Sequence, residues 1–127
     1  MNPSEYSATV DSYFGSIVLE VYKAYSGKMK KENALDFDDL LLCFRQILDI
    51  AEVREYFHNR FQYFMVDEYQ DTNALQYETI RILASHSKNL CVVGDDWQGI
   101  YSWRGADISN ILNFKRDYSN AKVINLE

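Results

Sequence analysis

The sequence predicts an α/β fold: a parallel sheet with crossover helices, preceded by an N-terminal helical segment. Three short apolar runs have the length and composition of buried strands. Segments between them repeat apolar residues every three or four positions, as helices do. The alternation of strand and helix is typical of a parallel sheet in which each helix crosses from one strand to the next.

Helical periodicity dominates the first part of the chain. Apolar residues recur at helical spacing over 14–25, which predicts a helix there. Asp36 is expected to cap a second helix, because Asp38 and Asp39 then fall in the first turn, where carboxylates favour the helix dipole. A short third helix is expected over 52–59.

The second part carries the strands. We predict strands at 61–66, 90–93 and 122–126, with helices at 74–87 and around 108–118. Three strands make a small sheet, and parallel sheets normally have both faces covered. We therefore expect further strands upstream of this segment in a complete domain.

Composition sets limits on function. The chain has 127 residues, the length of one ordinary domain, and a hydrophobic content of 47% that suits a globular core. Its formal net charge is −6, which argues against a free-standing nucleic-acid binder, because such proteins present a basic surface.

Cysteine and histidine positions argue against a structural metal site. Cys43 and Cys91 lack CxxC spacing, and Cys91 lies in an apolar run, which predicts a small core residue. His58 and His86 have no ligand-type neighbours. No apolar run approaches the roughly 18 residues of a membrane span, and no signal peptide is visible, so a cytoplasmic location is expected.

Two carboxylates follow the first predicted strand at once. Open α/β sheets bind ligands at the carboxyl ends of their strands, which is where Asp67 and Glu68 stand. One acid can hold a hydrated magnesium ion, and its neighbour can polarise a water for attack on a terminal phosphate. On these residues alone, a solvated acidic turn remains the alternative.

The loop after the second predicted strand carries Gln98, Tyr101, Trp103 and Arg104 within seven residues. A glutamine can hydrogen-bond a phosphate or its attacking water, and an arginine can neutralise charge in the transition state. Aromatic side chains on a loop can stack single-stranded bases at about 1–3 kcal/mol each. The alternative is that Tyr101 and Trp103 anchor the loop in the core.

Four segments, in this order, resemble the UvrD/Rep/PcrA-like helicases of superfamily 1. They are LDFDDLL at 35–41, VDEYQDTN at 66–73, VVGDDWQGIYSWRGA at 92–106 and INLE at 124–127. The segment at 66–73 resembles helicase motif II in its DExQD form, that at 92–106 resembles motif III, and that at 124–127 resembles the lead-in to motif IV. The resemblance covers 35–127.

The resemblance implies a partial RecA-like (P-loop NTPase) fold. Residues 1–34 would be the helical tail of an inserted subdomain, and 35–127 the C-terminal half of the first RecA-like ATPase domain. The parent protein would be an ATP-dependent DNA helicase of the kind that serves DNA repair, located in the cytoplasm on the nucleoid. It would couple Mg-ATP hydrolysis to movement along single-stranded DNA, usually 3′ to 5′, and would separate duplex at junctions of single- and double-stranded DNA.

The same resemblance implies roles for residues of the first acidic segment. Asp67 would hold Mg²⁺ largely through water, and Glu68 would activate the attacking water. Gln70 would tie the ATP site to the neighbouring motifs.

Four residues of the loop after the second predicted strand also receive roles from the resemblance. Gln98 would contact the γ-phosphate region of ATP. Arg104 would link the nucleotide site to DNA, and Tyr101 and Trp103 would meet the bases of single-stranded DNA.

The sequence departs from the family's pattern in three respects. Trp97 stands where a third acid is common, and Gly99 where serine is common. No G-x-x-x-x-G-K-[ST] loop is present, so little in this chain would cradle the phosphates. We therefore expect a fragment that neither hydrolyses ATP nor unwinds DNA alone. Apolar surface left open by absent strands can also lead such a fragment to self-associate.

Two other functions fit part of the pattern. A helicase remnant could have kept its fold and lost its chemistry, acting as an interaction module. A magnesium nuclease could use Asp67, Glu68, Asp95 and Asp96 as ligands, but it leaves the loop from Gln98 onward unexplained.

Overall fold

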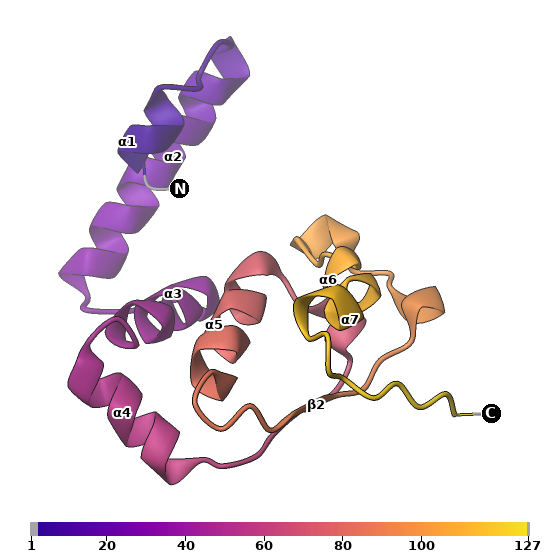
Figure 1. Cartoon of the computed structure of the whole chain (residues 1–127). Coiled ribbons are helices and arrows are strands. Elements are labelled where there is room, and N and C mark those ends of the chain that lie inside the picture. The colour runs from indigo at the N-terminus through magenta and orange to yellow at the C-terminus, as the bar shows by residue number, and fades with distance from the viewer. Residues whose placement is uncertain (1–2, 127) are drawn as a thin grey trace. The chain divides into compact units, whose positions relative to one another are not determined.

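The computed structural model describes residues 3–126, without the side chain of Arg104 (Figure 1). The chain divides into two compact units, 1–40 and 41–127. It is a mixed α/β structure that combines several helices with one two-stranded parallel sheet. None of the described helices is long and apolar enough to cross a membrane.

Two helices form most of the first unit: α1 (Pro3–Ser7) and α2 (Tyr13–Lys31). Ser12 caps α2 by accepting a hydrogen bond from the backbone N–H of Gly15 at 3.0 Å. The rings of Tyr6 and Tyr22 meet edge to face, with centroids 6.3 Å apart, and join the two helices. The predicted helix at 14–25 is therefore confirmed but longer, and α1 is too short to show periodicity.

Asp36 caps the next helix, α3 (Phe37–Ile47), as predicted. Its Oδ1 accepts a hydrogen bond from the Asp39 N–H at 2.8 Å, and Asp39 Oδ2 accepts one from the Asp36 N–H at 3.3 Å. The Tyr25 hydroxyl donates to Asp36 Oδ2 at 2.8 Å. The bond from Asp39, followed by that from Tyr25, lowers the pKa of the Asp36 carboxyl.

The second unit contains α4 (Ala51–Arg60), β1 (Phe64–Val66), α5 (Ala74–Ala84) and β2 (Leu90–Val92). The strands run parallel, with Phe64 opposite Leu90 and Val66 opposite Val92, and α5 is the crossover between them. Asn73 and Gln76 cap α5 reciprocally, each side chain bonding the other's backbone N–H at 2.9 Å.

The chain after β2 contains only short elements. They are the 3₁₀ turns η2 (Asp96–Gln98) and η3 (Ser102–Arg104) and the helices α6 (Ser109–Leu112) and α7 (Phe114–Asp117). The single helix predicted around 108–118 is thus wrong in detail. Asn113, with ψ near 0°, ends α6 and begins α7, so the periodic apolar residues span two helices.

The predicted third strand, 122–126, is wrong for the part of the chain that is described. No strand is assigned there, and none of the described backbone hydrogen bonds joins these residues to β1 or β2. Ile124 and Leu126 are 69% and 88% exposed. An apolar run becomes a strand only beside a partner that takes its backbone hydrogen bonds, and sequence periodicity does not supply one. Glu127 lies outside the described residues.

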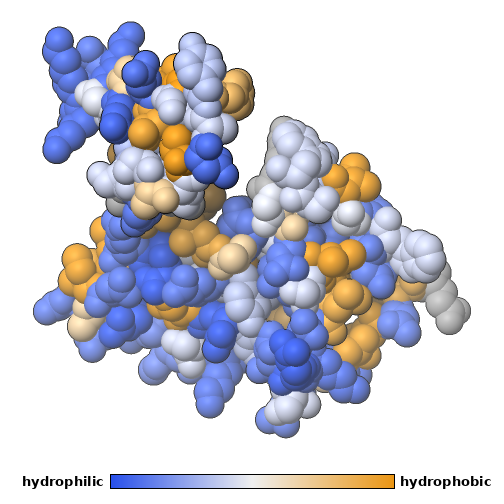
Figure 2. All heavy atoms as spheres, turned by 90° about the horizontal axis from the view of Figure 1, so that it is seen from above, coloured by the Kyte–Doolittle hydropathy of each residue, from blue (hydrophilic) through white to orange (hydrophobic). Residues whose placement is uncertain are grey.

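The strands are covered on one face rather than on both. Phe64, Val66 and their partners on β2 are half-buried, whereas Met65 is 80% exposed and faces an exposed Cys91 across the register. The prediction that Cys91 is a core residue is therefore wrong, because alternate side chains of a strand point to opposite faces. Figure 2 shows apolar side chains interspersed among hydrophilic ones on the surface in that view.

Aromatic contacts build the core. Phe44 of α3 meets Phe57 of α4 edge to face at 5.5 Å, beside the fully buried Leu48. Tyr69 is also fully buried and meets Phe114 edge to face at 5.6 Å. Burial raises the pKa of the Tyr69 phenol far above its usual value.

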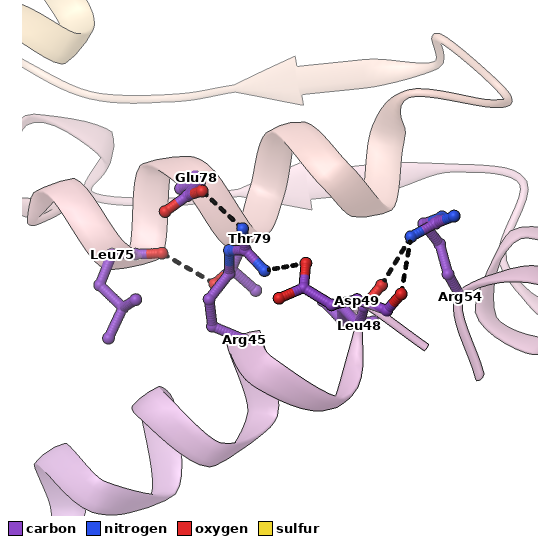
Figure 3. A network of polar contacts seen from close by, with 7 residues as sticks. All are labelled: Arg45, Leu48, Asp49, Arg54, Leu75, Glu78 and Thr79. Carbon is purple, nitrogen blue, oxygen red and sulfur yellow. Dashed lines mark hydrogen bonds and ion pairs between the residues drawn. The ribbon is translucent and has the colours of Figure 1, made fainter. Parts of the chain in front are cut away.

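A polar network joins α3 to α5 beside this core (Figure 3). Arg45 donates to Asp49 and to Glu78, each at 2.7 Å, so one guanidinium ties its own helix to α5. Arg54 donates to the carbonyl of Leu48 at 3.0 Å, which secures the turn between α3 and α4. The hydrogen bond to Glu78, followed by that to Asp49, raises the pKa of the Arg45 guanidinium, which therefore stays charged.

The cap of α3 leads to a prediction about pH. A carboxyl whose folded-state pKa is lowered adds stability above its ordinary pKa of 3.8, and this stability is lost as the pH falls through the lower folded-state value. We expect the chain to melt at a higher temperature than the Asp36→Asn variant at pH 7, and this advantage to be lost as the pH falls below 3.8 and through the lower folded-state pKa. Thermal unfolding followed by circular dichroism across this range measures it. Asp38→Asn, in the same helical turn, is the control, and an equal pH response in both variants would contradict the assignment.

Candidate functional site

The predicted site residues follow the carboxyl ends of β1 and β2. Beyond the strands, the Val93 N–H donates to the Val66 carbonyl at 2.8 Å, and the Tyr69 N–H donates to the Val93 carbonyl at 2.9 Å. These bonds continue the pairing by one step after β2. The acidic turn at 67–71 and the loop at 94–106 therefore begin side by side.

Asp67 and Glu68 form an exposed turn. Glu68 has a left-handed backbone, with φ 51° and ψ 41°, and its N–H donates to Asp67 Oδ1 at 2.9 Å. This conformation costs a non-glycine residue about 1–2 kcal/mol. It is followed directly by the 3₁₀ turn η1 (Tyr69–Asp71), in which Tyr69 and Gln70 are buried. The two exposed carboxylates are thus followed directly by two buried residues, Tyr69 and Gln70, which anchor the turn.

The buried side-chain amide of Gln70 connects the two loops. Its Nε2 donates to Glu68 Oε2 at 2.7 Å and to Asp71 Oδ2 at 3.3 Å. Its Oε1 accepts a hydrogen bond from the Asp95 N–H at 3.1 Å. Gln70 is only 1% exposed, so both ends of the amide are satisfied by protein rather than by water.

Asp95 extends this connection to Gln98. Its Oδ2 accepts a hydrogen bond from Gln98 Nε2 at 2.8 Å, and its Oδ1 accepts one from the Trp97 N–H at 3.0 Å. The bond from Gln98, followed by that from Trp97, lowers the pKa of the Asp95 carboxyl. The structure therefore brings Glu68, Gln70 and Gln98 into one chain of hydrogen bonds that runs through Asp95.

Gly94 permits this close approach. A Cβ atom on Gly94 would lie 2.5 Å from Gln70 Oε1, 2.8 Å from Ile111 Cδ1 and 3.2 Å from the Tyr69 nitrogen. Contacts this short force neighbours to move. While Gln70 keeps its place, only glycine therefore fits at position 94.

The far ends of the two loops are also joined. Asn73 forms an antiparallel bridge with Ala106, and the Asp107 N–H donates to the Thr72 carbonyl at 3.0 Å. The buried Asn110 donates to the carbonyl of Thr72 at 3.0 Å and to its hydroxyl at 3.2 Å. Sequence reasoning missed this role of Asn110, because nothing in its local pattern points to a partner 38 positions away.

The remaining predicted residues lie further along the loop at 94–106. Trp103 is 73% exposed and Tyr101 is 40% exposed, so the alternative that Trp103 is a core anchor is wrong. The backbone of Arg104 lies in η3, and its side chain is outside the described part of the structure. Trp97, the departure from the family's pattern, is 92% exposed. The described contacts place no member of this group against Glu68.

The donor groups at the turn suit magnesium held mainly through water. Among the described residues, no group of three or more His, Cys, Asp or Glu side chains is gathered as a metal site. Mg²⁺ keeps several waters and takes only one or two carboxylates from a protein. The exposed carboxylates of Asp67 and Glu68 fit that requirement, whereas the carboxylate of Asp95 already accepts two hydrogen bonds.

Gly94 gives a prediction about stability. We expect Gly94→Ala to lower the free energy of unfolding by about 1–3 kcal/mol, because the new methyl group must displace both Gln70 and Ile111. Gly27→Ala is the matched control, since nothing lies within 4 Å of a Cβ there. In α2, that change should stabilise by about 0.5–1 kcal/mol. Urea unfolding measures both, and a neutral Gly94→Ala variant would contradict the packing described.

Comparison with known proteins identifies the family. The model for the UvrD/REP helicase N-terminal domain matches residues 1–119. The ATP-dependent DNA helicase PcrA of Bacillus subtilis (strain 168) is 50% identical over 126 residues, which are 98% of this chain and 17% of that protein. PcrA of Staphylococcus aureus (strain Mu50 / ATCC 700699) is 48% identical over the same share of each chain. The chain thus spans about 17% of the length of these relatives. The resemblance found in the motifs is confirmed: the chain belongs to the UvrD/REP helicase N-terminal domain family.

Proposed function

We propose that this chain is part of an ATP-dependent DNA helicase that couples Mg-ATP hydrolysis to movement along single-stranded DNA, in the 3′ to 5′ direction, and to unwinding at duplex junctions. The relatives named as ATP-dependent DNA helicases support the activity. The observation that carries the mechanism is the hydrogen-bonded link from Glu68 through Gln70 and Asp95 to Gln98.

Asp67 and Glu68 carry the chemistry in this proposal. Asp67 would hold hydrated Mg²⁺, and the ion would supply positive charge toward the phosphates of ATP. Glu68 accepts a proton from the attacking water. The bond from Gln70 occupies Glu68 Oε2 and leaves Oε1 available to the water. The buried amide therefore orients a carboxylate that is otherwise exposed.

In this proposal Gln98 couples the loop at 94–106 to the acidic turn at 67–71 through Asp95. One hydrogen of its Nε2 is donated to Asp95, so a hydrogen bond to a γ-phosphate must use the second hydrogen of Nε2 or replace the bond to Asp95. When the bond from Gln98 is lost, Asp95 Oδ2 no longer has that partner. The backbone N–H of Asp95 donates to Gln70, which connects this change to the other loop. We propose that ATP binding and hydrolysis change the loop at this step.

The loop at 94–106 then meets DNA through Tyr101 and Trp103. The Trp103 side chain is 73% exposed, and stacking of a base on an aromatic ring contributes about 1–3 kcal/mol per base. Arg104, the next residue in η3, links the nucleotide site to the strand in this proposal.

We propose that residues 35–127 form the C-terminal half of a RecA-like ATPase domain, and that 1–34 belong to an inserted helical subdomain. The one-sided sheet and the unpaired run at 122–126 support this, since further strands would complete both. The same open surface supports self-association of the chain on its own. A DNA motor works where DNA lies, so we propose that the parent protein acts in the cytoplasm on the nucleoid.

Neither alternative function is favoured by a specific observation. A nuclease would need metal ligands from the loop at 94–106, and the Asp95 carboxylate is taken by Trp97 and Gln98. An inert remnant would not need Glu68 and Gln98 to stay connected. Assays on a chimera and on the isolated chain distinguish the nuclease and the inert remnant from the motor.

A chimera tests the motor directly. We expect Bacillus subtilis PcrA, with its matching 126-residue segment replaced by this chain, to hydrolyse ATP and to be stimulated by single-stranded DNA. Glu68→Gln should lower the turnover number at least about 100-fold, because general-base catalysis contributes that much, and should leave ATP affinity within a few-fold. Glu52→Gln, in the exposed first turn of α4, is the control. Turnover that ignores DNA, in a chimera with an unchanged melting temperature, would favour the interaction module.

The isolated chain should behave differently from the chimera. We expect the 127 residues alone to show no magnesium-dependent ATP turnover, because they contain no glycine-rich loop to hold the phosphates. A phosphate-release assay with the Glu68→Gln chain as background measures this. Turnover above that background would contradict the prediction, and cleavage of a labelled oligonucleotide would support the nuclease.

A further inference from the structure

A separate pocket lies in the 41–127 unit, away from the candidate nucleotide site. It has a volume of about 560 Å³ and is formed by the C-terminal end of α5, the start of β2, α7 and the segment after it. The candidate nucleotide site follows the carboxyl end of β2, whereas this pocket includes Leu90 at its amino end. The lining of this pocket includes Arg81, Lys88, Phe114, Asp117, Tyr118 and Lys122.

Three cations line this pocket in a chain whose net charge is −6. Arg81 lies over the Tyr77 ring at 5.6 Å, and none of the ion pairs found among the described residues involves Arg81, Lys88 or Lys122. The dipole of α5 favours a cation in its last turn, which accounts for Arg81 but not for Lys88, four residues beyond the helix. It does not account for Lys122, which follows α7 and lines the same pocket.

The pocket has one acidic residue, whose charge is already engaged. Asp117 Oδ2 accepts a hydrogen bond from the Tyr77 hydroxyl at 2.8 Å, and its Oδ1 lies 3.4 Å from Arg116 Nε. Two lysines and an arginine therefore face a space whose only carboxylate has partners of its own. Such a space attracts an anion.

An aromatic pair supplies the other binding element of the pocket. The rings of Phe114 and Tyr118 stack with centroids 4.6 Å apart and an angle of 29°. Phe114 is fixed from behind by the fully buried Tyr69. Tyr118 is only half-buried, so part of its ring can receive a planar group.

We propose that this pocket binds a nucleoside phosphate, with the phosphate held by Lys88 and Lys122 and the base stacked on Tyr118. The volume lies in the range of small-ligand sites, about 300–1,000 Å³. Charge and ring together select a ligand that is both anionic and aromatic, which inorganic phosphate is not. Such a group is found on a free nucleotide and at the phosphorylated end of a nucleic-acid strand. The proposal does not depend on ATP hydrolysis or on Glu68.

Backbone amide chemical shifts in the ¹⁵N-labelled chain test the proposal. The probe is dAMP without magnesium, which disfavours binding at the Asp67–Glu68 turn. We expect shifts concentrated at Ser85, Lys88, Ser119 and Lys122. The double variant Lys88→Gln/Lys122→Gln should weaken binding at least about tenfold, because it removes two charge-assisted contacts. Lys30→Gln/Lys31→Gln, in α2, should not change it. Shifts confined to the residues around Glu68 and Gln98, or equal affinity in the double variant, would overturn the proposal.

Further probes identify the ligand. Deoxyadenosine without phosphate and inorganic phosphate should each bind at least about tenfold more weakly than dAMP, and Tyr118→Leu should weaken dAMP more than Tyr118→Phe does. Inorganic phosphate binding as tightly as dAMP would overturn the nucleoside part. A 5′-phosphorylated hexathymidylate that binds about tenfold tighter than dTMP would assign the pocket to strand ends. Equal affinity would assign it to free nucleotides.

Discussion

The buried amide of Gln70 is the contact on which the candidate site depends. Its nitrogen fixes the Glu68 carboxylate and its oxygen fixes the backbone of Asp95, so two loops that are distant in sequence keep a set spacing. An unsatisfied polar group in this buried position would cost about 1–3 kcal/mol. The hydrogen bonds of the Gln70 amide therefore stabilise both loops, and the loops in turn keep the amide in place. The strain at Glu68 persists because this surrounding structure determines it.

The choice of an amide has a chemical consequence. Only a carboxamide of this length offers a donor to a carboxylate at one end and an acceptor to a backbone N–H at the other. A glutamate in its place would present two acceptors to Glu68 and Asp71, and like charges at that distance would repel. The amide itself does not titrate, so its hydrogen bonds to the two loops need no change of its own protonation state.

Much of the fold could be predicted from the sequence, and the failures have physical reasons. Strands β1 and β2 and helices α2 to α5 follow from apolar periodicity and from caps such as Asp36. The run at 122–126 has the same apolar character without a neighbouring strand, and a pattern in one segment cannot report its partner. The exposure of Cys91 was not predictable, because an apolar run does not show how many faces of a sheet are covered.

The candidate site was predictable as a set of residues but not as a geometry. Asp67, Glu68, Gln98 and the aromatic loop could be selected because their chemistry and spacing are characteristic. The contact from Gln70 to Asp95 spans 25 positions, and that from Asn110 to Thr72 spans 38, so no local signal announces them. Roles assigned through the motifs remain proposals, whereas the hydrogen bonds between these residues are features of the structure.

Gly94 has an implication for how this segment can change over evolutionary time. A side chain there would occupy the space that Gln70 Oε1 now fills. Positions 70 and 94 are therefore not independent, and a larger residue at 94 becomes tolerable only after the residue at 70 has shortened and the loops have parted. Among descendants of this sequence, a side chain at position 94 should therefore appear only where residue 70 has also changed, whereas a change at 70 alone leaves glycine acceptable at 94.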